Sequence, residues 1–247
     1  MAGIQDRQLI VTAITATIAI VSISPRACAT AVVERWDQDS VGDTVDGAGS
    51  AGLENWERTF GTSSAGVIFS ESGDKMLRLD PATTLPLGVT TKIAYPNESV
   101  AGFLSIKANV RIETAGTGGA GNAYVFAAQN LDVTTGYLLD INAMTRQLTI
   151  ERSVAGSVTV LGAAFTVAPA FNFLISHSYE ARGTVIEPSE DLVVEVFIDG
   201  NLMFSRTDTS PISFTGGVKG GLLTTGGRSA VFDDFVAGGE GLIASKY

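Results

Sequence analysis

Apolar and polar residues alternate with a period of two over much of the chain after residue 65. In FLSIKANVRIE, residues 103–113, the apolar side chains at 104, 106, 108, 110 and 112 interleave with residues that are mostly polar. This spacing puts the apolar side chains on one side of an extended strand, as expected for a strand that is buried on one face. No long stretch repeats its apolar residues at helical spacing. The pattern therefore predicts an all-β protein.

Strands follow one another closely along the chain. They are predicted over residues 66–70, 76–80, 90–95, 102–112, 123–129, 136–142, 147–153, 157–165, 172–182, 192–198, 201–206, 218–224 and 230–236. Asp199-Gly200, between VVEVFI and NLMFSR, is the strongest hairpin signal, because an Asp-Gly pair suits a two-residue turn between antiparallel strands. We therefore expect a two-sheet antiparallel sandwich over residues 34–240, with a short C-terminal tail over 241–247.

The first 33 residues stand apart from this pattern. LIVTAITATIAIVSISPRACATA, residues 9–31, is rich in β-branched residues, which favours an extended β arm that docks on a surface outside its own domain. The apolar docking positions of this arm are Leu9, Ile10, Val11, Ile14, Ile18, Ile20, Val21 and Ile23. The same stretch also resembles a secretory signal peptide with Ala27-Cys28-Ala29 as its cleavage site. We expect a retained arm, and both interpretations remain open.

Composition narrows the classes of function. The 247 residues carry a formal net charge of −10 and contain no basic run, which argues against nucleic-acid binding. The N-terminal apolar run falls short of the roughly 18 residues that a membrane span needs, so no membrane span is expected. Cys28 is the only cysteine, which excludes a disulfide within the chain and a metal cluster built on cysteines.

The C-terminal third resembles the closing half of a concanavalin A-like, or laminin-G-like, jelly roll. The motifs that carry the resemblance are VVEVFIDGNLMFS, SFTGGVKGGLL and AVFDDFVA, and ERWDQDS with KMLRLD is similar to the opening half. The resemblance covers roughly residues 34–238. It implies the fold but no single function, since this architecture hosts lectins, glycan-binding modules, hydrolases and structural domains.

Catalytic chemistry is not expected. Glycoside hydrolysis needs two cooperating carboxylates, and the hydrolases of this fold class carry them in a Glu-x-Asp-x-x-Glu-like run on one strand, which is missing here. Glu195 and Asp199 share a strand face but lie about 13 Å apart at the rise of a strand. His177, the only histidine, lies in FLISHSYE, an ordinary strand pattern. We therefore predict that the chain is not an enzyme.

Acidic residues near both ends of the sandwich are the candidate metal ligands. A structural Ca²⁺, which the fold class often holds, would use Asp37, Asp39, Asp43, Asp233 and Asp234, because calcium prefers several oxygen ligands and the first and last strands usually neighbour each other in this fold. The plainer interpretation, a solvated acidic loop, is favoured.

Aromatic and amide side chains are the candidate sugar-binding groups. Trp56, Tyr124 and Tyr137 would stack on sugar rings, and Asn122 and Asn142 would form hydrogen bonds. Packing in the core or on the sheet surface is the more common role for each of them.

These observations predict a non-catalytic virion component, such as a capsid-decoration, fibre or tail protein of bacteriophage type. Its arm would dock on a neighbouring subunit by strand addition, in a homo-oligomer, and its sandwich would face outward toward host-surface glycans. The alternative is a secreted bacterial glycan-binding module with a cleaved signal peptide, followed by a secreted glycosidase.

Overall fold

The computed structural model describes most of the predicted sandwich. The described residues are 32–34, 36, 39–42, 56–60, 66–80, 87–93, 100–101, 105–113, 122–128, 134–186, 188–214, 218–225 and 228–238. The docking positions of the predicted arm, from Leu9 to Ile23, lie outside this set, as does the predicted tail over 241–247.

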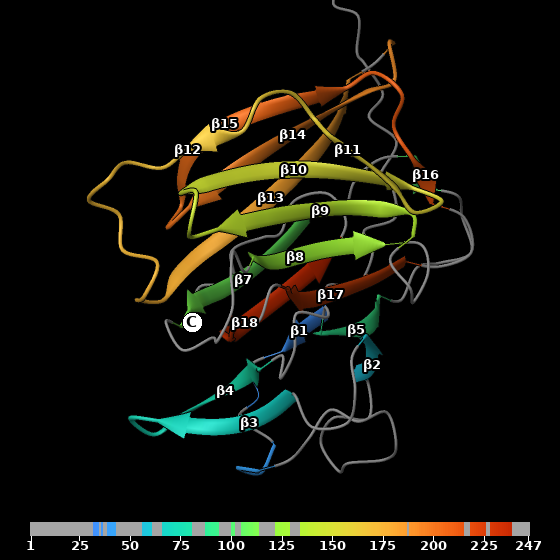
Figure 1. The fold of residues 1–247 in the computed structure, drawn as a ribbon. Helices are drawn as coiled ribbons and strands as arrows, with labels where there is room; N and C mark the ends of the chain where they lie inside the picture. The colour runs from blue at the N-terminus through green and yellow to red at the C-terminus, as the bar shows by residue number, and fades with distance from the viewer. Residues whose placement is uncertain are drawn as a thin grey trace, which may run out of the picture.

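The described residues form two large antiparallel sheets (Figure 1). The first sheet contains, in order, β15 (Asn201–Asp208), β14 (Asp191–Ile198), β13 (His177–Ile186), β7 (Ser105–Ile112), β18 (Ala230–Gly238), β4 (Asp74–Leu79) and β3 (Gly66–Glu71), with β1 (Val32–Glu34) also paired to β18. The second contains β11 (Ser157–Val160), β10 (Gln147–Val154), β9 (Gly136–Asn142), β8 (Asn122–Ala128), β17 (Val218–Thr224), β5 (Leu87–Ile93) and β2 (Trp56–Phe60), with β12 (Phe165–Thr166) paired to β10. A short pair joins β6 (Val100–Ala101) to β16 (Ser213–Phe214).

The chain passes between the sheets so that distant strands become neighbours. β7 pairs with β18 in the first sheet, while β8 pairs with β17 in the second. Both pairs join strands about a hundred residues apart, and every strand pairing is antiparallel. This crossed arrangement is the jelly-roll sandwich that the sequence predicted.

The core lies between the sheets and follows the alternation in the sequence. On β7 the buried apolar residues are Ile106, Ala108, Val110 and Ile112, and on β14 they are Leu192, Val194, Val196 and Ile198. The second sheet supplies Val125, Leu139, Ile141, Leu148 and Ile150 from its inner face. Burial of these apolar side chains is the main force that holds the two layers together.

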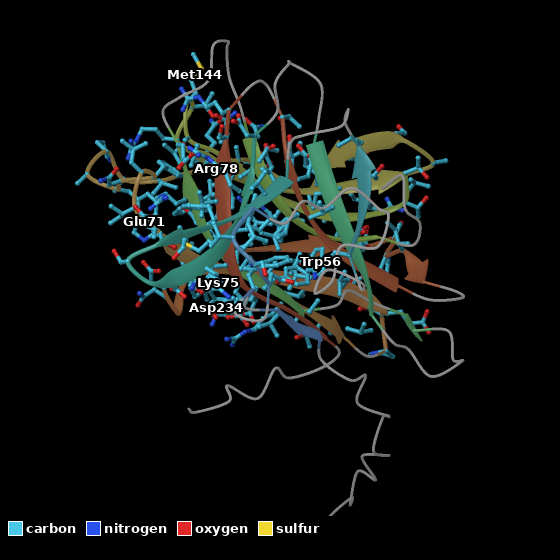
Figure 2. The ribbon with its side chains drawn as sticks, turned by 90° about the horizontal axis from the view of Figure 1, so that it is seen from below. Trp56, Glu71, Lys75, Arg78, Met144 and Asp234 are labelled. Carbon is cyan, nitrogen blue, oxygen red and sulfur yellow. The ribbon has the colours of Figure 1, made fainter. Side chains whose placement is uncertain are left out.

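Aromatic residues close the core beside the last strand. The rings of Trp36 and Trp56 lie 5.0 Å apart between centroids, and Trp56 meets Phe235 of β18 edge-on at 5.1 Å. Figure 2 shows Trp56 among the interior side chains, whereas Met144 lies at the periphery. The cluster ties β2 of the second sheet to β18 of the first.

A buried polar network also joins the sheets. The Tyr137 hydroxyl on β9 donates to Asp208 Oδ2 on β15 at 2.7 Å and accepts the Ile212 N–H at 2.9 Å. Arg152 Nε on β10 lies 3.3 Å from the same Asp208 oxygen. Tyr137 thereby gives both Asp208 and the Ile212 N–H a buried hydrogen-bond partner, which is the condition for keeping polar groups in a core.

Most strand predictions agree with the structure. Residues 136–142 and 218–224 match β9 and β17 in full, and the all-β fold class is confirmed. The prediction for 172–182 begins too early, because residues 172–176 form a turn in which the Asn172 side chain accepts the Leu174 N–H. The described residues contain no helix of the length and hydropathy that a membrane span requires.

Replacing Tyr137 by phenylalanine tests the network between the sheets. We expect Tyr137→Phe to lower the free energy of unfolding by about 1–3 kcal/mol, because Asp208 and the Ile212 N–H lose a buried partner. Urea unfolding measures this loss. Tyr179→Phe is the matched control, since Tyr179 is equally buried and its hydroxyl has no hydrogen bond to a described residue. Equal losses in both variants would contradict the assigned role.

Candidate functional site

A group of polar side chains lies on the outer face of the second sheet. Ala123, Val125, Leu139, Ile141, Leu148 and Ile150 point into the core, so the intervening residues point outward. We call Asn122 and Tyr124 of β8, Asp140 of β9, and Thr149 and Glu151 of β10 the outer-face cluster. Three adjacent strands therefore contribute to it (Figure 1).

The register of these strands brings the cluster together. Asp140 pairs directly with Tyr124 on one side and with Thr149 on the other. Glu151 lies two residues beyond Thr149 on the same strand, which makes it the diagonal neighbour of Asp140 on the same face. Diagonal neighbours on one face are close enough for long side chains to interact.

Hydrogen bonds connect the members of the cluster. Asn122 Nδ2 donates to Asp140 Oδ2 at 3.0 Å and to the Tyr124 hydroxyl oxygen at 3.2 Å. Thr149 Oγ1 makes a long contact of 3.5 Å with the same Asp140 oxygen. The other two oxygens, Asp140 Oδ1 and Asn122 Oδ1, are buried without a hydrogen-bond partner. No described protein group satisfies either oxygen, which is uncommon for a buried polar atom in a folded protein.

Burial and mutual repulsion raise the pKa values of the acidic groups in the cluster. Burial, and secondarily the charge of Glu151, raises the pKa of Asp140 to about 8. Burial also raises the pKa of Glu151, and burial together with the Asp140 charge raises the pKa of Tyr124 to about 12. Asp140 therefore keeps its proton at neutral pH, and it can act as a hydrogen-bond donor as well as an acceptor.

The predicted sugar-binding residues fall into two groups. Tyr124 and Asn122 belong to the outer-face cluster, and Asn142 begins the adjoining turn, where its Oδ1 accepts the Met144 and Thr145 N–H groups at 3.0 Å. Trp56 and Tyr137 lie in the core with 3% and 0% of their surface exposed. The prediction that these two rings stack on sugars is wrong, because core packing covers both.

The predicted calcium ligands that the structure describes are Asp39, Asp233 and Asp234. Asp39 is buried in the loop after β1, where its backbone oxygen accepts a hydrogen bond from Lys75 Nζ at 2.6 Å. Asp233 and Asp234 lie at a bulge in β18, and Asp234 Oδ2 accepts a hydrogen bond from Asn109. Asp37 and Asp43 lie outside the described residues, within which no group of three or more acidic, histidine or cysteine side chains could hold a metal. The calcium site stays a prediction.

His177 has a structural role. Its Nδ1 contacts Asp199 Oδ2 at 2.7 Å, its Nε2 contacts the Asn172 carbonyl at 3.0 Å, and its ring stacks on Phe171. Both nitrogens are thus engaged in holding the turn before β13 against the Asp199-Gly200 hairpin.

Sequence reasoning missed Asp140, Thr149 and Glu151. It searched for paired carboxylates along one strand, whereas this pair spans the hairpin between β9 and β10. A signal was present, because the four-residue turn between Asn142 and Gln147 places Asp140 opposite Thr149. Counting across the turn would have brought the two carboxylates together.

Comparison with known proteins identifies the fold. No protein-family model and no curated protein matches the sequence. Among solved structures, the endo-1,3-beta-glucanase of Streptomyces sioyaensis is similar with a TM-score of 0.54 and 12% identity, over 87% of this chain and 99% of that one. The potassium-bound carbohydrate recognition domain of Emp46p gives 0.52 and 11%, over 85% and 100%. A Bacteroides ovatus GH16 protein gives 0.53 and 10%, over 78% and 98%. These likenesses confirm the concanavalin-like jelly-roll fold.

Unfolding at different pH values tests the buried carboxyl group. The folded protein keeps the Asp140 proton up to about pH 8, whereas an unfolded chain releases it above about pH 4, so this group lowers stability as the pH rises through that window. We expect the stability of Asp140→Asn relative to the wild type to rise by more than about 1 kcal/mol across the window.

Asp191→Asn is the matched control on the first sheet, where Asp191 is only partly buried. It should show no such rise. A constant difference between Asp140→Asn and the wild type from about pH 4 to about pH 8 would contradict the environment assigned to Asp140.

Proposed function

We propose that this protein binds carbohydrate on the outer-face cluster. The observation that carries the proposal is that five polar side chains gather, half-buried or buried, on the outer face of a sheet whose inner face is dry. Sugars present many hydroxyl groups that donate and accept hydrogen bonds. The cluster offers both kinds of partner from an amide, a phenol, a hydroxyl and two carboxyl groups.

The position of the cluster on paired strands supports this function. Backbone pairing on both sides fixes β8, β9 and β10, so the side chains that they carry are held at defined spacings. Groups on rigid strands need little ordering when a ligand arrives, which preserves binding free energy. The Tyr124 ring adds a partly exposed aromatic surface beside the polar groups.

The fold is compatible with this proposal. One of the similar structures is a carbohydrate recognition domain and another is a glucanase, and each shares little more than a tenth of its residues with this chain. That similarity supports the fold alone, so the case for sugar binding depends on the residues of this chain.

Glycoside hydrolysis is the second candidate, and the Asp140–Glu151 pair favours it. Hydrolysis of a glycosidic bond requires one protonated and one ionised carboxyl group on the same face. Asp140, which keeps its proton at neutral pH, would be the acid, and Glu151 would be the base or nucleophile. The pair lies on two strands, unlike the one-strand run expected for the hydrolases of this fold class.

The virion role stays a prediction. The docking segment lies outside the described residues, except that Val32 and Val33, assigned to the arm, pair with Ala237 and Val236 in the first sheet. We propose that a retained arm would extend from β1 toward a neighbouring subunit, and a secreted glycan-binding module remains the alternative.

A glycan array with a pair of asparagine variants tests sugar binding. We expect the wild type to bind one class of glycan and Asn122→Ala to lose at least about tenfold in affinity, because two of the hydrogen bonds that order the cluster disappear. Asn109→Ala is the matched control, since Asn109 makes a similar bond to Asp234 on the first sheet. It should bind as the wild type does.

The outcomes separate the two candidates. An unchanged affinity in Asn122→Ala, or no binding to any glycan, would contradict the proposed site. If the wild type cleaves the bound glycan and Glu151→Gln does not, the protein is a hydrolase and not a binding protein alone.

A further inference from the structure

Several carboxylates elsewhere in the sandwich are paired with arginines. The pairs are Asp208 with Arg152 at 3.3 Å, Glu180 with Arg182 at 2.6 Å, and Glu113 with Arg78 at 2.8 Å. Asp140 and Glu151 differ, because among the described side chains neither contacts an arginine, a lysine or a histidine. Two neighbouring acidic groups therefore share one face without a compensating charge.

A second observation points to a missing ligand group. Asp140 is 7% exposed, yet its Oδ1 has no hydrogen-bond partner, although its Oδ2 contacts Asn122 and Thr149. A buried oxygen of this kind is costly in the free protein. A positive charge on a ligand would favour the ionised form of Asp140 and offset the repulsion from Glu151 that opposes this ionisation.

We infer that the outer-face cluster selects glycans that carry a free primary amine, with the ammonium group beside Glu151 and within Coulombic reach of Asp140. This inference rests on the proposed carbohydrate-binding function and names its ligand class. A hydroxyl or an acetamido group at the same position of the sugar supplies no charge. The net charge of −10 adds a long-range attraction for a polycationic chain.

Binding of the ammonium group changes the protonation of Asp140. The titratable side chains around Asp140 in the described structure are Tyr124 from β8 and Glu151 from β10. When the ligand arrives at about pH 6, where the amine of an amino sugar is mainly protonated, Asp140 gives up its carboxyl proton to the buffer and becomes a carboxylate, while the ligand keeps its own charge. Binding therefore releases up to one proton, and it weakens as the salt concentration rises.

Three oligosaccharides with one backbone and different substituents test the inference. Cello-, N-acetylchito- and chito-oligosaccharides of equal length present a hydroxyl, an acetamido group and an ammonium on the same β-1,4-linked chain. Calorimetry at about pH 6, in two buffers with different ionisation enthalpies, measures affinity and proton release. We expect the chito-oligosaccharide to bind at least about tenfold more tightly than the other two, with release of protons.

Two glutamate variants assign the effect to the cluster. Glu151→Gln should reduce the preference for the amine to less than about threefold, whereas Glu195→Gln, the same change on the outer face of the first sheet, should leave it intact. Equal affinity for all three sugars would overturn the inference and leave sugar binding standing. Binding of none of them, together with an empty glycan array, would overturn both.

Two further outcomes would also overturn the inference. An equal loss of preference in both glutamate variants would mean that overall charge, and no specific site, attracts the amine. Calcium chloride titrated alone, if it binds with a dependence on Glu151, would show that the acidic pair serves a metal ion.

Discussion

The dry layer between the two sheets is the constraint on which the rest of the structure depends. Each strand alternates, so one side must be apolar enough to exclude water and the other side is left for polar groups. The inner rows from β7, β14, β9 and β10 meet this condition with almost unbroken aliphatic side chains. The polar exception, Tyr137 with Asp208 and Arg152, ties the sheets together through a hydrogen bond and an ion pair. The side chains of the inner face therefore serve to stabilise the fold.

The outer faces can present functional side chains, and the two sheets present different charged groups there. The first sheet presents ion pairs such as Glu180 with Arg182, in which each charge is compensated. The second presents Asp140 and Glu151 without a described cation, beside a phenol and an amide. A desolvated acidic pair opposes folding, so its presence on a regular part of the sheet is best explained by a ligand that offsets it. This contrast is the physical basis of both functional proposals.

The sequence predicted the fold well because alternation carries direct information on burial. It could not assign every side chain to a face. In GYLLDIN, however, the polar Asp140 and Asn142 share one face, so the alternation already puts Tyr137 with Leu139 and Ile141 on the apolar face, and the sugar-stacking prediction overlooked this phase. Trp56 lies on a short strand whose neighbours are polar, and only tertiary packing against Trp36 and Phe235 shows that it is buried. Pairing across the β9–β10 hairpin, which sequence reasoning did not use, was needed to bring Asp140 and Glu151 together.

The protonation of Asp140 is the most direct test of this account. Carbon-13 NMR of the side-chain carboxyl groups, followed across pH in the wild type and in Glu151→Gln, measures it without any ligand. The account predicts that the Asp140 carboxyl titrates near pH 8 in the wild type and at a lower pH once the Glu151 charge is removed. An ordinary aspartate titrates at about pH 3.9. A midpoint close to that value in both proteins would contradict the account.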